Sequence, residues 1–278
     1  MPPVRPSRRR FLRCGAALTL AAALPPLADN ATDRLAAAWM GADAGAGPRF
    51  ADADVLSAQA GRFDAVLVPA YAAALLLLAG RARRLTGSGW PGRAHDPAGA
   101  YTLPYRLTQA ALVYRTPPAR PSLDDLFAPG ALWPDYGRLS LGLALLRNGR
   151  PPDDAHTGHL ARAARDLAQA RPRLVADPAA ALASGAGEVA LTLVDLAAPP
   201  AAAHLPAEGR LVLEFDWVIT ANARAPERTE ARLRTTLAQR PAAFRPMPPG
   251  SWTLAPLPAS ARPAWTRAWA EVRTLARH

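Results

Sequence analysis

Apolar and polar positions follow two periods along the chain, and their order predicts the fold class. Residues 63–69 (FDAVLVP) form an apolar run ended by a proline, which is typical of a buried strand, and residues 70–81 continue as an apolar helix. Residues 159–171 (HLARAARDLAQAR) place leucine and alanine on one stripe, as an amphipathic helix does. A strand that leads directly into a helix indicates α/β architecture, and we expect an α/β protein.

The same reading extends over most of the chain. We expect further strands at residues 34–39, 101–105, 110–114, 132–133, 188–194 and 211–219. We expect further helices at residues 52–62, 138–147, 178–183, 226–239 and 262–276, and a helix start of the capping-box kind at 122–125. Loops are expected at residues 41–48, 86–99 and 116–121. The last helix carries Trp265, Trp269 and Val272 on one face, which predicts a packing stripe.

The N-terminus has the pattern of a targeting segment. Residues 7–13 read SRRRFLR, an apolar run follows at 14–24, and small residues lead to Ala28. The heptad resembles the twin-arginine export signal, S-R-R-x-F-L-K, and the run is shorter than the roughly 20 apolar residues that span a bilayer. We therefore expect the twin-arginine export machinery to carry the protein to the periplasm, with the signal cleaved near Ala28.

Charge and cysteine content narrow the function classes. Every basic residue is an arginine; the first 28 residues hold five of the 33, which leaves 28 against 22 acidic residues, a net charge of +6. These arginines are scattered rather than clustered, so we expect no nucleic-acid partner. The single cysteine, Cys14, lies in the signal, and His156 and His159 have no further metal ligands at useful spacing. We expect neither a metal nor a cofactor.

No sequence motif points to catalysis. The chain has no G-x-S-x-G nucleophile elbow and no glycine-rich phosphate loop, and nothing groups a nucleophile with a base. An exported hydrolase would need such a pair, so we expect a protein that is not an enzyme.

Six blocks in order resemble the periplasmic spermidine/putrescine-binding proteins, which are type II extracellular solute-binding proteins of ABC importers. The blocks are residues 63–69 (FDAVLVP), 99–105 (GAYTLPY), 108–114, 122–129 (SLDDLFAP), 163–172 and 213–219 (LEFDWVI). The resemblance implies a two-lobed type II fold that holds a solute in the cleft between its lobes. It also implies a monomer that presents the solute to ABC permease subunits in the inner membrane.

The lobe boundaries follow from the same resemblance. Residues 29–114 with 214–250 are expected to form the first lobe and residues 115–213 the second, with residues 251–278 as a helical segment packed on both. The chain is expected to cross near residues 114–118 and to return near 213–216.

The resemblance also implies a site for a cationic, polyamine-like solute. Such a ligand needs carboxylates for its ammonium groups and aromatic faces for its methylenes. Asp216 aligns with the family's amine-binding aspartate, and Glu214 shares its strand face because side chains two residues apart point the same way. Asp195, at the end of the strand 188–194, is a third candidate acid. Each of the three has the alternative of a solvated or hinge carboxylate.

Aromatic and polar positions complete the candidate site. Trp39 and Tyr71 lie close to positions where the family has ligand-contacting aromatics, with core packing as the alternative for Trp39. Gln109 and Arg106 lie on the segment that normally brings an aromatic to the cleft. An arginine there would disfavour a cationic ligand and favour a carboxylate.

The largest departure lies at residues 135–139 (DYGRL), where the family has D-D-x-R-E. Tyr136 and Leu139 replace the two acids that hold ammonium groups, and the first lobe is short between residues 39 and 63. Tyr136 thus becomes the candidate ligand contact at that position. The alternative function is a non-transport sensor or a degenerate binding protein, with a different ligand or no high-affinity ligand.

Overall fold

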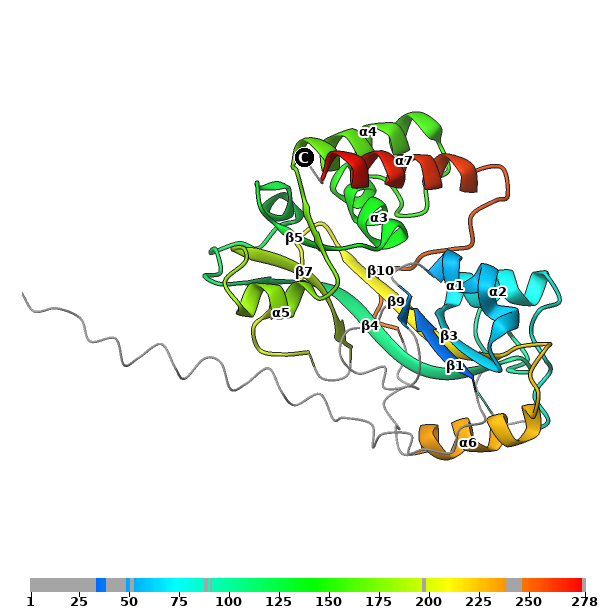
Figure 1. Ribbon diagram of the computed structural model, residues 1–278. Helices are drawn as coiled ribbons and strands as arrows, with labels where there is room; N and C mark the ends of the chain where they lie inside the picture. The colour runs from blue at the N-terminus through cyan, green and yellow to red at the C-terminus, as the bar shows by residue number, and fades with distance from the viewer. Residues whose placement is uncertain are drawn as a thin grey trace, which may run out of the picture.

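The computed structural model describes residues 34–38, 49–50, 53–87, 90, 92–196, 199–238 and 247–276. Their strands form one mixed sheet in the order β2-β1-β3-β9-β4-β7-β5-β6, with β10 beside β9 and β8 beside β4 (Figure 1). The strands are β1 (Leu35–Ala38), β2 (Arg49–Phe50), β3 (Ala65–Pro69), β4 (Thr102–Tyr114), β5 (Leu132–Pro134), β6 (Arg173–Val175), β7 (Val189–Asp195), β8 (Ala203–His204), β9 (Arg210–Ile219) and β10 (Ser251–Trp252). The expected α/β class is confirmed.

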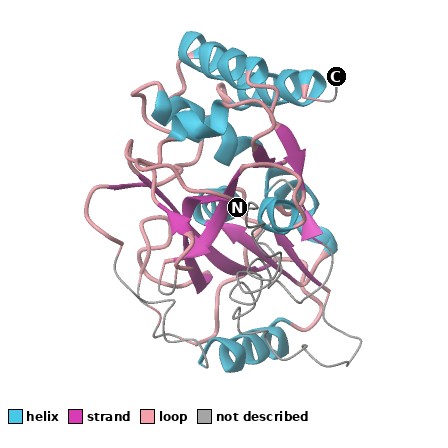
Figure 2. Cartoon of the chain, turned by 90° about the vertical axis from the view of Figure 1, so that its left-hand side faces the viewer, coloured by secondary structure: helices cyan, strands magenta, loops and turns pink. Residues whose placement is uncertain are grey.

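Helices lie on both sides of this sheet (Figure 2). They are α1 (Ala53–Gln59), η2 (Ala60–Arg62), α2 (Ala70–Leu78), η3 (Leu123–Phe127), α3 (Gly137–Arg147), α4 (Thr157–Gln169), α5 (Pro178–Ala183), α6 (Pro226–Ala238) and α7 (Arg262–Leu275). Helices α3, α4 and α7 pack together above the sheet in Figure 1, and α6 lies on the opposite side. The expected stripe of α7 is buried in this packing, because Trp265, Trp269 and Val272 are at most 6% exposed.

Two long strands, β4 and β9, connect the two halves of the sheet. One half contains β1, β2 and β3, and the other contains β5, β6 and β7. Residues 215–219 of β9 pair with β3, whereas residues 108–114 of β4 pair with β7. The change of partner falls at Thr108, which is opposite Leu213 of β9 on one side and opposite Asp195 of β7 on the other. The lobe boundaries expected from the sequence remain a prediction.

The strand β4 corrects one expectation, because the two strands expected at residues 101–105 and 110–114 are one strand, Thr102–Tyr114. The polar residues between them, Arg106, Thr108 and Gln109, interrupt the apolar pattern, yet Thr108 and Gln109 are at most 4% exposed. The ladder to β9 continues through these residues, with one irregularity between Pro104 and Arg106. Pairing on both edges therefore outweighs the local polarity of the segment.

Most other elements match their expected positions within a few residues. The capping box at Ser122 is present, although it starts a 3-10 helix. Helix α2 ends at Leu78 instead of residue 81. The short strands β2, β6, β8 and β10 had no signal in the sequence, because two or three residues are too few to show a period. None of the described helices is both long enough and apolar enough to cross a membrane.

Candidate functional site

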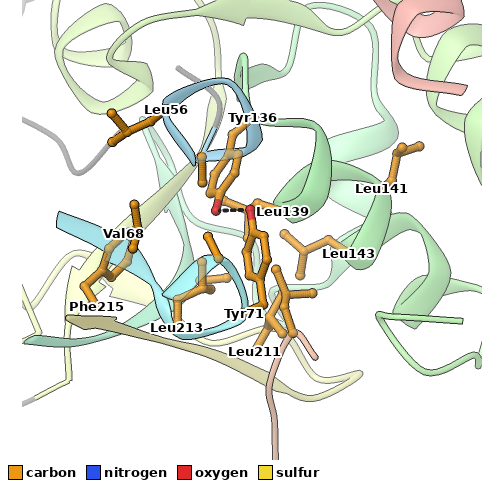
Figure 3. Close-up of a cluster of buried hydrophobic side chains, with 14 of the residues drawn as sticks. Leu56, Val68, Tyr71, Tyr136, Leu139, Leu141, Leu143, Leu211, Leu213 and Phe215 are labelled. Carbon is orange, nitrogen blue, oxygen red and sulfur yellow. Dashed lines mark hydrogen bonds between the residues drawn. The ribbon is translucent and has the colours of Figure 1, made fainter. Parts of the chain in front are cut away.

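Two tyrosines from the two halves of the sheet meet at the starts of α2 and α3. Tyr71 lies in the first turn of α2, immediately after β3 ends at Pro69, and Tyr136 is the N-cap residue of α3, after β5. Their hydroxyl oxygens are 2.8 Å apart in a buried hydrogen bond (Figure 3). Both side chains are at most 3% exposed. Tyr71 and Tyr136 were predicted independently as ligand contacts, and the structure places them in direct contact with each other.

The surroundings of this tyrosine pair are apolar. Leu139, Leu143, Leu211 and Leu213 lie around the two rings in Figure 3, and all four are buried. Leu139 stands where the resemblance would place a glutamate, and it is fully buried. An ammonium group at this position would therefore meet hydrocarbon where the family offers a carboxylate.

Asp216 and Glu214, the two acids expected on one face of β9, both contact basic residues of a single loop. The Asp216 carboxylate is fully buried and lies 2.9 Å from Nε2 of His95. Glu214 lies 3.5 Å from Nη1 of Arg93, with both side chains mostly buried. The loop, residues 92–96, belongs to the segment expected as a surface loop, and no pattern in the sequence predicted these contacts.

Burial and the neighbouring carboxylate of Asp216 oppose the ionisation of Glu214. Burial raises the pKa of Glu214 above its usual value, and the charge of Asp216 raises it further. Arg93 and, to a smaller extent, His95 act in the opposite direction, but the net pKa remains raised. The two carboxylates are therefore close enough to repel one another, as expected for side chains two residues apart on a strand.

The third acid, Asp195, also faces a basic side chain. Its carboxylate lies 3.6 Å from Nε of Arg106, on the neighbouring strand β4. Asp195 is about one-third exposed, so this contact is partly solvated. Gln109, three residues beyond Arg106, is 4% exposed, and its side-chain oxygen has no hydrogen-bond partner among the described residues.

Each acid that was expected to bind an ammonium group is therefore within 4 Å of a basic side chain of the same chain. A cationic solute would have to compete with Arg93, His95 and Arg106 for these carboxylates. The sequence anticipated this difficulty only for Arg106.

Arg138, the first residue of the helix expected at 138–147, was assigned no role in the sequence analysis, but it is buried beside the tyrosine pair. It lies in the first turn of α3, is 4% exposed, and donates from Nη2 to the carbonyl of Ala255 at 2.8 Å. Its guanidinium lies over the rings of Tyr71 and Trp265, at 5.1 and 4.3 Å from their centroids. The signal in the sequence is an arginine in the first helical turn, where acidic residues are favoured.

Two further expectations concern metals and Trp39. Within the described part of the chain, no three or more His, Cys, Asp and Glu side chains gather as metal ligands would. His159 instead contacts Asp154 at 2.7 Å, next to the His156 side chain that caps α4. Trp39 lies outside the described residues, so its expected ligand contact remains a prediction.

Comparison with known proteins relates this geometry to a fold. No protein-family model and no curated protein sequence matches the chain. A solved structure from Listeria monocytogenes, described as a spermidine/putrescine ABC transporter, matches with a TM-score of 0.69 at 16% identity, over 86% of this chain and 98% of its own. A periplasmic thiamin-binding protein matches with a TM-score of 0.60 at 14% identity, over 87% and 96% of the two chains.

A third similar structure is AgtB of Agrobacterium tumefaciens in complex with agropinic acid. It matches with a TM-score of 0.57 at 12% identity, over 90% of this chain and the whole of AgtB. The solutes named for these proteins are different compounds (spermidine or putrescine, thiamin and agropinic acid), whereas the arrangement of strands and helices is shared. The chain therefore has, in a divergent sequence, the fold of the type II periplasmic solute-binding proteins.

Proposed function

We propose that this protein is the exported solute receptor of an ABC importer, which captures a small solute between the two halves of its sheet and presents it to the permease in the inner membrane. The observation that carries the proposal is the contact between Tyr71 and Tyr136. It joins the first turn of α2 to the N-cap of α3, so a solute held there would touch both halves at once. The similar structures, all solute-binding proteins of this fold, support the same role.

Binding would work by a hinge movement. The long strands β4 and β9 are the elements that run through both halves, so bending them would separate Tyr71 from Tyr136 and admit a solute. Closure around the solute would exchange the hydrogen bond between the tyrosines for bonds to the ligand. No step in this cycle requires a catalytic group.

The N-terminal sequence supports a periplasmic location for the protein. The heptad SRRRFLR and the apolar run that follows it favour export through the twin-arginine machinery and cleavage near Ala28. We expect this receptor to act as a monomer on a membrane-bound permease.

The site differs from the expected polyamine site in its charges, because basic side chains already contact the three candidate acids. A cationic solute would bind Asp216, Glu214 and Asp195 only by displacing the basic side chains that now face them. The direct contact of the two tyrosines would also suit the alternative role, a sensor or degenerate protein that binds no solute tightly. Both possibilities can be tested with one solute panel.

The test is thermal unfolding of the exported protein, purified from the periplasm, against putrescine, spermidine, amino acids and small carboxylates. A solute at a hundred times its dissociation constant stabilises a protein by about 2.7 kcal/mol and raises its melting temperature by several degrees. A shift with at least one solute supports the receptor role. If polyamines produce it, Asp216→Asn should weaken their binding at least tenfold. A melting temperature that no solute changes would favour the degenerate binder.

A further inference from the structure

The side chain of Arg138 is a buried cation without a counter-ion among the described residues. It is 4% exposed, and its Nε and Nη1 atoms have no hydrogen-bond partner there. Asp135, the acid nearest to it in sequence, instead contacts Arg273 at 3.0 Å. Burying a charge without a partner is strongly unfavourable, so such groups are paired, coordinate a ligand or occupy functional sites.

The position of Arg138 adds to this positive charge. It lies in the first turn of α3, an 11-residue helix whose N-cap, Tyr136, makes no side-chain capping bond and whose first turn has no acidic residue. The first backbone N–H groups of a helix have no partner within the helix and carry the positive end of its dipole. A cation in this turn is unfavourable by itself and becomes favourable when an anion binds there.

The hydrogen-bonding groups around Arg138 suit a carboxylate. The guanidinium lies 5.1 Å from the ring centroid of Tyr71, whose hydroxyl bonds that of Tyr136. Two phenol hydroxyls and a guanidinium can all donate to one carboxylate, and the bonds from the charged donor are the stronger ones. The stacked ring of Trp265, at 4.3 Å, holds the guanidinium in place.

The acidic side chains of the region do not oppose an anion at this point. Asp216, Glu214 and Asp195 each lie within 4 Å of a basic side chain of the same chain, His95, Arg93 and Arg106 respectively. The uncompensated charge near the tyrosine pair is therefore positive.

We propose that the solute carries a carboxylate, which binds at the start of α3 between Arg138 and the hydroxyls of Tyr71 and Tyr136. This inference rests on the proposed receptor function and names its substrate class. The carboxylate replaces the hydrogen bond between the tyrosines and supplies the counter-ion that Arg138 lacks. Closure of the two halves follows, because the bound group contacts residues from both.

The test compares carboxylates with polyamines on the full chain after export. The probes are acetate, succinate and glutamate on one side and putrescine and spermidine on the other, measured by thermal unfolding and calorimetric titration. The wild-type protein is expected to be stabilised by at least one carboxylate and by neither polyamine. Arg138→Met should weaken that binding at least tenfold, and Arg138→Lys should restore part of it because it restores the charge.

Arg267→Met is the matched control, because Arg267 is exposed on α7 and lies away from the tyrosine pair in sequence. Circular dichroism verifies that Arg138→Met keeps its fold, and Tyr136→Phe provides a second variant that removes a donor while keeping the ring. Stabilisation by polyamines alone would overturn the carboxylate site and leave the receptor function standing. Carboxylate binding that survives in both Arg138→Met and Tyr136→Phe would overturn the site. A wild-type protein that no probe stabilises would contradict both the inference and the receptor function.

Discussion

The carboxylate of Asp216 lies 2.9 Å from Nε2 of His95, and the two side chains are 0% and 8% exposed. The residues are far apart in sequence. Among the described residues His95 is the only ion-pair partner of the Asp216 carboxylate, and neither carboxylate oxygen has a hydrogen bond there. When a buried carboxylate has a single ion-pair partner, removing that partner strongly lowers the stability of the protein.

We therefore expect His95→Leu to lower the free energy of unfolding by about 3–5 kcal/mol, since it leaves Asp216 buried and unpaired. The double variant His95→Leu with Asp216→Leu should recover most of that loss, because no polar side chain is then left buried without its partner. Urea unfolding of the two single variants and the double variant measures the coupling.

The exposed pair Arg83–Glu227, at 2.7 Å, is the matched control for this experiment. Arg83→Leu should lower the free energy of unfolding by no more than about 1 kcal/mol, as is usual for a solvated ion pair. A His95→Leu variant no less stable than Arg83→Leu would mean that water or another group balances Asp216.

Glu214 makes stability depend on pH in a definite direction. Its pKa is raised in the folded protein, chiefly by burial, so folding favours the protonated form. That contribution is complete below the unfolded-state value of 4.5 and is lost as the pH rises through the folded-state pKa.

Glu214→Gln cannot ionise, so it should gain stability relative to the wild type as the pH rises from 4 to 7. Urea unfolding of both proteins at pH 4, 5, 6 and 7 checks the sign. Glu188→Gln, at an exposed carboxylate that contacts Arg115, is the control and should show no such gain. A difference that is constant over this range would contradict the raised pKa.

The sequence predicted the parts of this protein that depend on local periodicity. The strand before Tyr71, the amphipathic stripe of α4 and the packing stripe of α7 all follow from residues close together in the chain. Tyr71 and Tyr136 could be selected as candidate site residues because they lie at or near positions that the resemblance to the polyamine-binding family places in the site. Their mutual contact could not, because it depends on how the two halves meet.

The basic partners of Glu214 and Asp216 could not be predicted from the sequence either, because they also depend on how distant segments pack. Arg93 and His95 lie in a loop rich in glycine and proline, which has no period and so gives no direction for its side chains. Arg138 looked like part of an ordinary helix, and its lack of a counter-ion is visible only once its neighbours are known. Pairing of charges over long sequence distances is a tertiary property.

The hydrogen bond between Tyr71 and Tyr136 can be measured with a double-mutant cycle. A buried hydrogen bond contributes about 0.5–1.5 kcal/mol to stability, and we expect Tyr71→Phe and Tyr136→Phe to be coupled by an energy of this size. Urea unfolding of the two single variants, the double variant and the wild type gives the coupling. Tyr101→Phe with Tyr136→Phe, a pair with no hydrogen bond between its side chains, is the control and should be additive within about 0.5 kcal/mol.

Gly137 couples the start of α3 to α7, because there is no room for a side chain at this position. A Cβ added to Gly137 would lie 2.6 Å from Cγ and 2.8 Å from Cδ1 of Trp269, a buried and rigid ring. Overpacking of this kind costs about 1–3 kcal/mol, which exceeds the roughly 1 kcal/mol that alanine gains over glycine in a helix. We expect Gly137→Ala to be destabilising and to weaken solute binding, since Tyr136 and Arg138 flank it.

Gly158 provides the matched control, because it also lies in the first turn of a helix, where a Cβ would meet only the exposed side chain of His156 at 3.1 Å. Gly158→Ala should be neutral or slightly stabilising in the same urea unfolding experiment. Trp269→Leu will itself lower the free energy of unfolding. In that background, however, Gly137→Ala should lower it much less than in the wild type, because leucine leaves room for the added Cβ. Equal effects of Gly137→Ala in both backgrounds would show that the ring of Trp269 does not set the position of α3.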